Sequence, residues 1–593
     1  MMKDKKLIIA IFLFSFVIVP FIMNAATAER KGDKKKEQIQ RTVTNNFDLQ
    51  FNTVSNFSFP VTNYGILFLD VARNVGGGYW PRGSLNQYFF GGGIWFGARK
   101  WIPADSLDPT TGDTIRYRRL NKLVELSYNP NSGLSWMVPG RIDDGDLIDN
   151  EDIKKYRVYF STDFRTSDGK PINPDDGPAW PIWDASKNED DELMVDRYFG
   201  YYISDPNLRT LENYPKGPAF ISGEDIFSTF KDTDLNYYEK GVQFRKNLGY
   251  PMKLQFEQYI YSWGYGDYKD FIFLRYDIIN YSNDTLYDCW LAPVMDVDIA
   301  RAPNTAAGAA NDFARFYDED PALNLAVQWT RDDPMEKGYG FGYLGFDFLE
   351  SPAVYQCESL IDTIINGNVE SWCTMCTKDS TVVVTDPGGT NPRDSVFCVE
   401  RIAFPKELVD YPRKDKKFYE NKYQLGLRTF KRWPINEDLD NDDARYDNIS
   451  SQVIEEGQGE AGDYRFLMAT GPFNMMPRDT VRTVVGIILS SPAVFPDANG
   501  STEDLVELVR KDKFAQRVYD NNFQAPRPPD KSIIYRWDPL NSAIKLVWDS
   551  SAEMSNDKYE RGLDFMGFRL YLSLIHISEP TRLLSISYAV FCL

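Results

Sequence analysis

Hydrophobic and polar positions alternate most regularly between residues 251 and 300, where three runs rich in aromatic and β-branched residues are separated by two turn-forming segments. The turns are expected at residues 264–267 and 282–284. The middle run has the period of two expected of a strand, with Ile272, Leu274, Tyr276 and Ile278 on one face and Arg275, Asp277 and part of Phe271 and Phe273 on the other. The pattern predicts an antiparallel meander with one well-buried face, around which the rest of the chain is arranged.

The same strand pattern recurs on both sides of this meander. Further strands are predicted within residues 47–100, near 323–329 and 340–348, and on either side of a turn at 477–479 in the stretch 464–489. The glycines at 91–93 lie among aromatic strand residues and lack the Lys-Ser/Thr and the helix of a phosphate-binding loop. They predict a tight turn or bulge where strands approach closely. The predicted fold class is mainly β, with several antiparallel β-sandwich domains.

One helix interrupts the β pattern. It is predicted from about Thr502 to Asn522, with Ser501 at its start and Asp504 three residues on. Its apolar side carries Leu505, Leu508, Val509, Ala515, Val518 and Tyr519. The proline-rich residues 525–529 end the helix as a stiff linker, which predicts a domain boundary.

The N-terminus has the order of a secretory signal. Lysines within residues 3–6 precede an apolar run over 7–23, and the small residues Ala26-Thr27-Ala28 place cleavage after Ala28. An uncleaved anchor helix is the alternative, but Pro20 and the A-x-A pattern favour cleavage. We therefore expect a secreted or cell-surface protein with no membrane span after the signal is removed.

The C-terminus has a different origin. Residues 572–582 (LSLIHISEPTR) and 586–593 (ISYAVFCL) resemble the in-frame translation of a transposase-type sequencing adapter, and 583–585 fit the place of a short index. We interpret 572–593 as an artefact that cuts the gene short near Tyr571, with a genuine apolar tail or anchor as the alternative. The only histidine in the sequence, His576, lies in this segment, so histidine triads and histidine-ligated metals are excluded from the rest.

The charge narrows the range of partners. The chain carries a net charge of −20, of which the signal contributes +2 and the last segment nothing, so residues 29–571 carry −22. So acidic a chain repels nucleic acid and anionic lipid, and it suits a soluble extracellular protein that binds calcium. Residues 29–40 are a charged leader without an apolar period.

The cysteines are concentrated in one insertion. Cys357, Cys373, Cys376 and Cys398 lie in a segment that is also rich in Asp, Thr, Val, Gly and Pro. In an exported protein this predicts two disulfides with three possible pairings. A four-cysteine zinc site is the alternative, although only Cys373 and Cys376 have the Cys-x-x-Cys spacing. Cys289 lies within the third strand of the meander and is predicted to be a buried free thiol.

The sharpest candidate site lies at the end of the meander. Asp296 and Asp298 alternate around Val297, so their carboxylates project from one face of the strand. The loop 301–311 could bring Asp312 back over them, and the three carboxylates would then form a calcium site. The preferred interpretation is a pair of carboxylates that faces water at a strand end, and calcium is the alternative.

A second acidic run matches a calcium loop only in part. Asp438, Asp440 and Asp442 have its one-three-five spacing, but Asp443 and Ile449 stand where the loop needs glycine and glutamate. An acidic solvated loop is therefore the preferred interpretation of this run.

Residues 544–572 (IKLVWDSSAEMSNDKYERGLDFMGFRLYL) place Trp548 on one strand and Phe568 and Leu570 on the next. This resembles the opening of a fibronectin type III domain, whose second strand carries the core tryptophan and whose third reads G-[FY]-R-[VL]-Y. Only about three strands of such a domain precede the C-terminal segment.

Other pieces resemble large uncharacterised surface proteins of Bacteroidota-type bacteria. They are VSNFSFPVTNYGILF, SLNQYFFGGGIWFGA, FIFLRYDIINYSNDTLYDCWLAPVMDVDI, GYLGFDFLESP and YRFLMATGPFNMMPRDTVRTVVGIIL, with the helix that leads into the fibronectin-like start. The resemblance covers most of residues 47–571, but its motifs describe strands and turns rather than a site. Members of this group often end in a sorting domain for type IX secretion, which is absent from this sequence, so the export route stays open.

These patterns divide the chain into seven expected parts. They are the signal (1–28), the leader (29–45), an N-terminal β-rich domain (46–245), a central β-sandwich domain (246–500) with the cysteine insertion (351–400), a helix and linker (501–529), a truncated fibronectin type III-like domain (530–571) and the adapter-like segment (572–593).

Two functions compete at this stage. The first is a non-enzymatic structural or interaction protein, secreted or at the cell surface, that presents β-sandwich loops for adhesion, contact with glycans or assembly of cell-envelope components. The second is a secreted glycan-active enzyme that uses two carboxylates and needs neither histidine nor cofactor. No catalytic residues can be chosen from the sequence. The protein is expected to require no cofactor beyond the calcium considered above.

Overall fold

The computed structural model describes a mainly β protein of antiparallel sheets with few helices. The described residues are 47–108, 110–144, 156–165, 169–173, 180, 220–238, 242–302, 305–330, 341–355, 359–365, 368–384, 393–405, 422–437, 439–457, 459–491, 505–520, 523, 529–530, 532, 534–540, 543–555, 565 and 567–568. The expected signal, the charged leader and the adapter-like segment lie outside them. None of the helices in the described part is long and apolar enough to cross a membrane.

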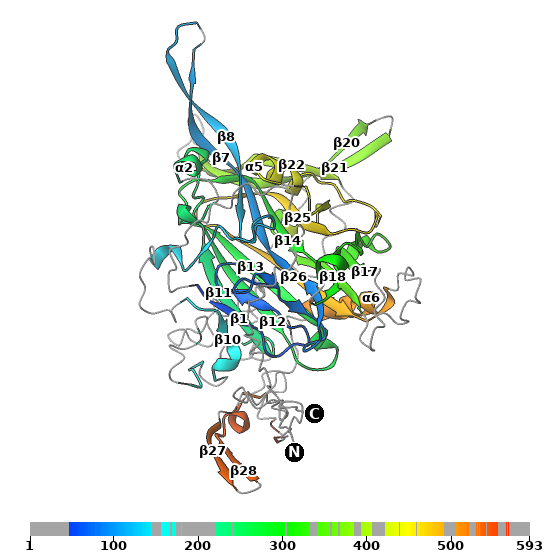
Figure 1. The fold of residues 1–593 in the computed structure, drawn as a ribbon. Helices are drawn as coiled ribbons and strands as arrows, with labels where there is room; N and C mark the ends of the chain where they lie inside the picture. Colours follow the sequence, from blue (N-terminus) through cyan, green and yellow to red (C-terminus); the bar gives the residue numbers. More distant parts are fainter. Residues whose placement is uncertain are drawn as a thin grey trace, which may run out of the picture. The chain divides into compact units, whose positions relative to one another are not determined.

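The larger sheet has nine strands among the described residues and is antiparallel (Figure 1). Its order is β10 (Tyr159–Phe160), β11 (Glu224–Lys231), β12 (Leu254–Ser262), β13 (Phe271–Asn280), β26 (Thr480–Ser490), β18 (Tyr343–Glu350), β17 (Leu325–Thr330) and β16 (Asp312–Phe316), with β9 (Val138–Pro139) also paired to β11.

The second sheet has five strands among the described residues and contains the longest strand pair of the two sheets. Its order is β24 (Thr429–Pro434), β25 (Tyr464–Met475), β14 (Leu286–Asp296), β7 (Gly91–Leu107) and β8 (Thr114–Leu126). Each sheet joins strands from before and after residue 246, since β7 pairs with β14 and β11 pairs with β12. The two β regions expected to be separate domains therefore build the same pair of sheets.

Smaller elements complete the described part. The strands are β1 (Leu49–Phe51), β2 (Pro60–Thr62), β3 (Leu69–Asp70), β4 (Val75–Gly76), β5 (Gly78–Tyr79), β6 (Asn86–Phe89), β15 (Ala300–Arg301), β19 (Ala353–Tyr355), β20 (Ser359–Ile365), β21 (Asn368–Val384), β22 (Arg393–Pro405), β23 (Lys422–Gln424), β27 (Ile534–Leu540) and β28 (Ala543–Trp548). The α-helices are α2 (Val242–Leu248), α3 (Thr305–Ala309), α5 (Asp442–Ile449) and α6 (Val506–Asp520).

The central meander is confirmed for its first two strands and wrong for its third. β12 and β13 pair antiparallel, with Leu254 opposite Asn280, but the other edge of β13 is occupied by β26. β14 therefore crosses into the five-stranded sheet and pairs with β7 and β25. The crossover is held by Asn280, whose side-chain amide donates to the carbonyls of Asp284 and Met475 at 3.0 and 3.1 Å.

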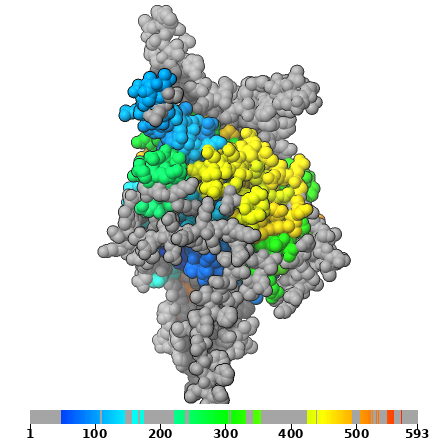
Figure 2. Space-filling view, turned by 45° about the horizontal axis from the view of Figure 1, so that its top comes forward, coloured from blue at the N-terminus to red at the C-terminus, as the bar shows by residue number. Residues whose placement is uncertain are grey.

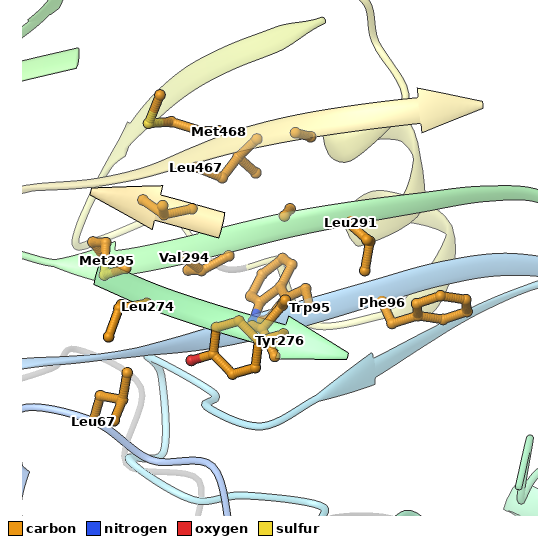
Figure 3. Close-up of a cluster of buried hydrophobic side chains, with 14 of the residues drawn as sticks. Leu67, Trp95, Phe96, Leu274, Tyr276, Leu291, Val294, Met295, Leu467 and Met468 are labelled. Atoms are coloured by element: carbon orange, nitrogen blue, oxygen red, sulfur yellow. The ribbon is translucent and has the colours of Figure 1, made fainter. Parts of the chain in front are cut away.

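The two faces of β13 are divided as the sequence pattern predicts. Ile272, Leu274, Tyr276 and Ile278 are buried in one core together with residues of the five-stranded sheet. Figure 3 shows Leu274 and Tyr276 among Trp95, Leu291 and Val294. The rings of Phe346 on β18 and Phe466 on β25 lie 4.7 Å apart, so the two sheets share this core.

The opposite face of β13 is also buried, because α6 covers the larger sheet there. Leu508, Ala515, Val518 and Tyr519 of α6 pack with Phe271 and Phe273 in a second core. The predicted helix is thus confirmed over residues 506–520, and its buried side is the expected one. Helix α6 therefore belongs to the same core as the nine-stranded sheet.

The three glycines at 91–93 are correctly assigned to a close approach, but they do not form a turn or bulge. They begin β7 and pair with Asp296, Met295 and Val294 of β14. A Cβ atom on Gly91 would lie 2.6 Å from the Tyr128 ring and hydroxyl, and one on Gly93 would lie 2.4 Å from the Ser127 hydroxyl. Glycine is required because the loop that follows β8 packs directly on this strand.

The cysteine insertion forms the sheet β20–β21–β22, with Cys373 and Cys376 on β21 and Cys398 on β22. The side chains of these three residues, and Cys357 altogether, lie outside the description, so the disulfides and the zinc alternative stay predictions. Cys289 is buried with a free thiol as expected, and burial raises the pKa of that thiol well above its ordinary value.

The fibronectin-like start contains the hairpin β27–β28. The ring of Trp548, at the end of β28, contacts the ring of Phe568 at 5.0 Å between centroids. These are the two aromatic residues that the resemblance places on neighbouring strands. The assignment to a fibronectin type III domain stays a prediction.

Candidate functional site

An acidic cluster lies where β14 ends and β25 begins. Asp296 is the last residue of β14 and Asp463 directly precedes β25. Because Asp296 pairs with Arg465 across the two strands, Asp463 is brought beside the end of β14. One carboxylate oxygen from each of Asp296, Asp298 and Asp463 lies within 4.8 Å of the others.

Asp296 has fixed partners at this site. Its Oδ2 accepts hydrogen bonds from the Tyr128 hydroxyl at 3.1 Å and from Arg465 Nε at 3.4 Å. Arg465 also donates to Asn131 Oδ1 and to the Pro130 carbonyl, which orient its guanidinium. Burial alone would lower the pKa of Arg465, but attraction to Asp296 and nearby acidic groups raises it. One of the three carboxylates is therefore neutralised by a protein cation.

Asp312 lies beside the cluster rather than within it. Its Oδ2 accepts from the Ile299 amide at 2.8 Å and from Gln328 Nε2 at 3.4 Å, which fix it at the start of β16. Its Oδ1 is buried and has no hydrogen-bond partner in the described part of the chain. Burial, with the charge of Asp298 as a further cause, raises the pKa of Asp312 well above its ordinary value.

Asp296 and Asp298 lie close together, but β14 ends at Asp296, so they do not share the face of one strand as predicted; Asp463 is the third carboxylate of the cluster. The sequence pattern predicted strand β25 but not its neighbour, so nothing placed Asp463 beside residues that precede it by more than 160 positions. The available signal was an aspartate directly before a predicted strand. Such aspartates are common in an acidic chain, so this signal does not identify a site. Oxygen ligands without nitrogen or sulfur select hard cations such as Ca²⁺.

The second acidic run has another structural role. Asn441 caps α5 by accepting from the Ala444 amide at 2.9 Å, and Asp442 is the first residue of the helix. Both carboxylate oxygens of Asp442 accept from Arg245 Nη1 at 3.3 Å. Asp442 is therefore held by a buried arginine. Asp438 lies outside the described residues.

A projecting hairpin is the other candidate site. β14 pairs with β7 only as far as Arg99, and from Lys100 to Leu107 β7 pairs with β8 alone. This two-stranded ribbon, residues 100–121, is called the arm below, and it extends past the sheet in Figure 1. Trp101, Ile115 and Tyr117 are 42%, 45% and 45% exposed on it.

The base of the arm contacts α5. Lys122 forms an ion pair with Asp447, and its ammonium lies 5.7 Å from the centre of the Tyr446 ring. Figure 2 shows the β8 segment in blue beside the α5 segment in yellow on one face of the molecule. The arm therefore starts from an ordered junction with an acidic helix.

No protein-family model matches this chain, and a search of curated proteins found no match. The class that the fold defines is an antiparallel, mainly β protein with one helix packed on its larger sheet. The functional assignment therefore rests on the acidic cluster and the arm.

Proposed function

We propose that this protein is a non-enzymatic structural or interaction protein, secreted or at the cell surface, that contacts glycans or cell-envelope components through loops and hairpins of its β-sandwich. The observation that carries the proposal is the arm. Its tryptophan and tyrosine are about two-fifths exposed on a ribbon that has no neighbouring strand among the described residues.

The arm adds little to the hydrophobic core, so a role in core packing does not explain its length. A two-stranded ribbon is at best marginally stable in water, and exposed large hydrophobic side chains gain nothing from burial. Trp, Tyr and Arg are the residue types that dominate binding energy at protein interfaces. Trp101, Tyr117 and Arg118 lie on this ribbon, which favours a role in contact with another molecule.

Buried charges in the sandwich support a structural interpretation. Asp277 accepts from both Arg275 and Arg482 at 2.6 Å, across β13 and β26. Lys511 of α6 donates to Asp270 at 2.6 Å, and the same carboxylate accepts from Trp80 Nε1 at 2.9 Å. These groups join neighbouring elements to one another, which is the work of a scaffold.

We also propose that the acidic cluster binds calcium as a structural ion. Asp296, Asp298 and Asp463 would supply carboxylate oxygens, and water would complete the six to eight ligands that calcium takes. The buried Asp312, whose pKa is raised by burial and by the charge of Asp298, adds a carboxylate that a cation would stabilise. The ion would link the ends of β14 and β25.

Incubation of the purified protein with plant, algal and bacterial polysaccharides tests the proposed function. Retention on one or more immobilised polysaccharides or envelope fractions, without release of reducing ends, is expected. Sustained release of reducing ends would contradict the proposal and favour the carboxylate-dependent enzyme. Heat-denatured protein provides the control for adventitious binding.

A further inference from the structure

A fully buried glutamate lies on β8, just inside the base of the arm. Glu125 pairs with Phe96 of β7, and its side chain is not exposed to solvent. Its Oε2 accepts a hydrogen bond from the Tyr238 hydroxyl at 2.5 Å, while its Oε1 has no hydrogen-bond partner among the described residues. An ionised carboxylate needs partners for both oxygens in a protein interior. The surroundings of Glu125 therefore suit a protonated carboxyl group better than a carboxylate.

Two arginines lie in the same cluster of side chains, but neither forms an ion pair with Glu125. Arg245 of α2 and Arg445 of α5 both face Asp442, with nitrogen–oxygen distances of 3.3 and 3.8 Å. Both guanidinium groups are almost fully buried, so Asp442 is the anion that balances them. Glu125 itself has no ion-pair partner in the described part of the chain.

Burial raises the pKa of Glu125 well above its ordinary value, and the nearby carboxylates of Asp232 and Asp442 raise it further. The Tyr238 hydrogen bond and the charge of Arg245 act in the opposite direction but do not cancel the effect of burial. The Glu125 carboxyl group therefore keeps its proton at pH values at which an exposed glutamate is ionised.

The other titratable groups of the cluster shift in the same direction. Asp232, which follows β11, accepts from the backbone amides of residues 252–254, yet burial raises its pKa to about 7 against the opposing charge of Lys100. Burial likewise raises the pKa of Asp442 despite its two arginines, and it raises the pKa of the Tyr250 hydroxyl well above its ordinary value. The cluster therefore binds protons more tightly than the same groups do in water.

The same cluster attaches two short helices to the edge of β8. Asp442 at the start of α5 accepts from Arg245 of α2, whose guanidinium carbon lies 4.1 Å from the centre of the Trp136 ring. The Tyr250 hydroxyl, just after α2, accepts from the Val124 amide at 2.9 Å and donates to the Val124 carbonyl at 2.8 Å. α2 has seven residues and α5 has eight, so neither is stable without tertiary contacts. The docking of both helices therefore depends on this cluster.

We propose that Glu125 forms the core of a pH-sensitive switch, in which α2 and α5 dock on the edge of β8 while Glu125 is protonated and undock when it ionises. With the helices docked, the buried carboxyl group keeps its proton. With the helices undocked, water reaches the group and its pKa returns to the ordinary value of about 4.3. The undocked state therefore binds fewer protons, so rising pH favours it and falling pH favours the docked state. Undocking would uncover the backbone edge of β8, where another strand can pair, whatever the arm binds.

Hydrogen exchange of the purified protein, followed by mass spectrometry between pH 5 and pH 7, tests this inference. After correction for the intrinsic exchange rates, the amides of α5 and those around Val124 should lose protection as pH rises, by up to about tenfold per pH unit for each proton released. Glu125→Gln keeps the shape of the side chain and cannot ionise, so it should lose at least tenfold less protection over this range. The control variant Glu437→Gln removes an exposed glutamate and should follow wild type.

A second variant keeps the test independent of how well Glu125→Gln folds. Tyr238→Phe removes the hydrogen bond that favours the ionised form of Glu125, so the loss of protection should move to higher pH. Equal loss of protection in wild type and Glu125→Gln overturns the switch, and so does wild-type protection that pH does not change. If Glu125→Gln does not fold, a Tyr238→Phe variant that loses protection at the same pH as wild type overturns it.

Discussion

Asp277 illustrates how this protein uses buried charge at the level of single residues. Burial alone would raise the pKa of Asp277, but the guanidinium groups of Arg275 and Arg482 outweigh it and hold that pKa well below its ordinary value. Removing the carboxylate would leave the buried Arg275 and the partly buried Arg482 without this anion. We expect Asp277→Asn to lower the free energy of unfolding by about 3–5 kcal/mol in urea titrations. Asp267→Asn, at a half-exposed pair with Arg510, should cost less than about 1 kcal/mol.

The same residue predicts a pH dependence. Because the folded-state pKa of Asp277 is depressed, the folded protein binds fewer protons there than the unfolded chain. This contribution to stability is fully present above about pH 4, the ordinary aspartate pKa, and is lost as pH falls further toward the depressed folded-state value. Urea titrations between pH 6 and pH 3 should show a smaller loss of stability for Asp277→Asn than for wild type. Equal losses would contradict the depressed pKa.

The calcium proposal is also decided by single residues. Calcium should raise the melting temperature of the wild-type protein by linkage, and Asp298→Asn or Asp463→Asn should abolish most of that rise. Asp440→Asn, an exposed aspartate of the other acidic run, should leave it intact. A melting temperature that calcium does not change would remove the proposal, and a rise that survives both Asp296→Asn and Asp298→Asn would move the site elsewhere.

At the scale of elements, α6 shows how a helix is attached to the larger sheet. Lys511 of α6 is buried and contacts Asp270, which also accepts from Trp80 and Asn56. Lys511→Met should lower the free energy of unfolding by about 3 kcal/mol, because it leaves a buried carboxylate without its cation. Exposed Lys513→Met is the control, with an expected cost below about 1 kcal/mol. Hydrogen exchange should show faster exchange of α6 amides only in the first variant.

The positions of the cysteines on β21 restrict which disulfide pairings are possible. Cys373 and Cys376 lie three residues apart on β21, which separates their Cα atoms by about 10 Å, beyond the reach of about 7 Å for a disulfide. Mass spectrometry of an unreduced digest should find Cys357, Cys373, Cys376 and Cys398 in linked peptides without a Cys373–Cys376 bond. Cysteines that alkylate fully without reductant would contradict the disulfides.

The sequence predicted individual strands and helices better than it predicted which strands pair in a sheet. The period of two around Leu274 and Tyr276 identified both faces of β13, because alternation is a local property of a strand. It could not show that β26 would occupy the next position in the sheet, because that pairing joins segments about 200 residues apart. Asp463 was missed for the same reason, while Asp296 and Asp298 are neighbours in sequence and were found.

At the scale of the whole molecule, two sheets share one aromatic core and a helix covers the outer face of the larger sheet. Strands from distant parts of the sequence pair in both sheets, so the contacts that build the two sheets are mostly non-local. The arm belongs to this scaffold at its base, where β7 pairs with β14, and leaves it beyond Arg99. A rigid base and an exposed end are what an interaction element requires.

The central claim is that the exposed aromatic side chains of the arm make contact with other molecules. The most direct measurement is the fraction of purified protein that sediments with isolated cell envelopes of a Bacteroidota-type bacterium. Trp101→Ala with Tyr117→Ala should reduce the bound fraction at least fivefold. Val506→Ala with Met554→Ala removes two exposed hydrophobic side chains elsewhere and should leave it unchanged. Equal binding by the arm variant and wild type, at unchanged melting temperature, would contradict the claim.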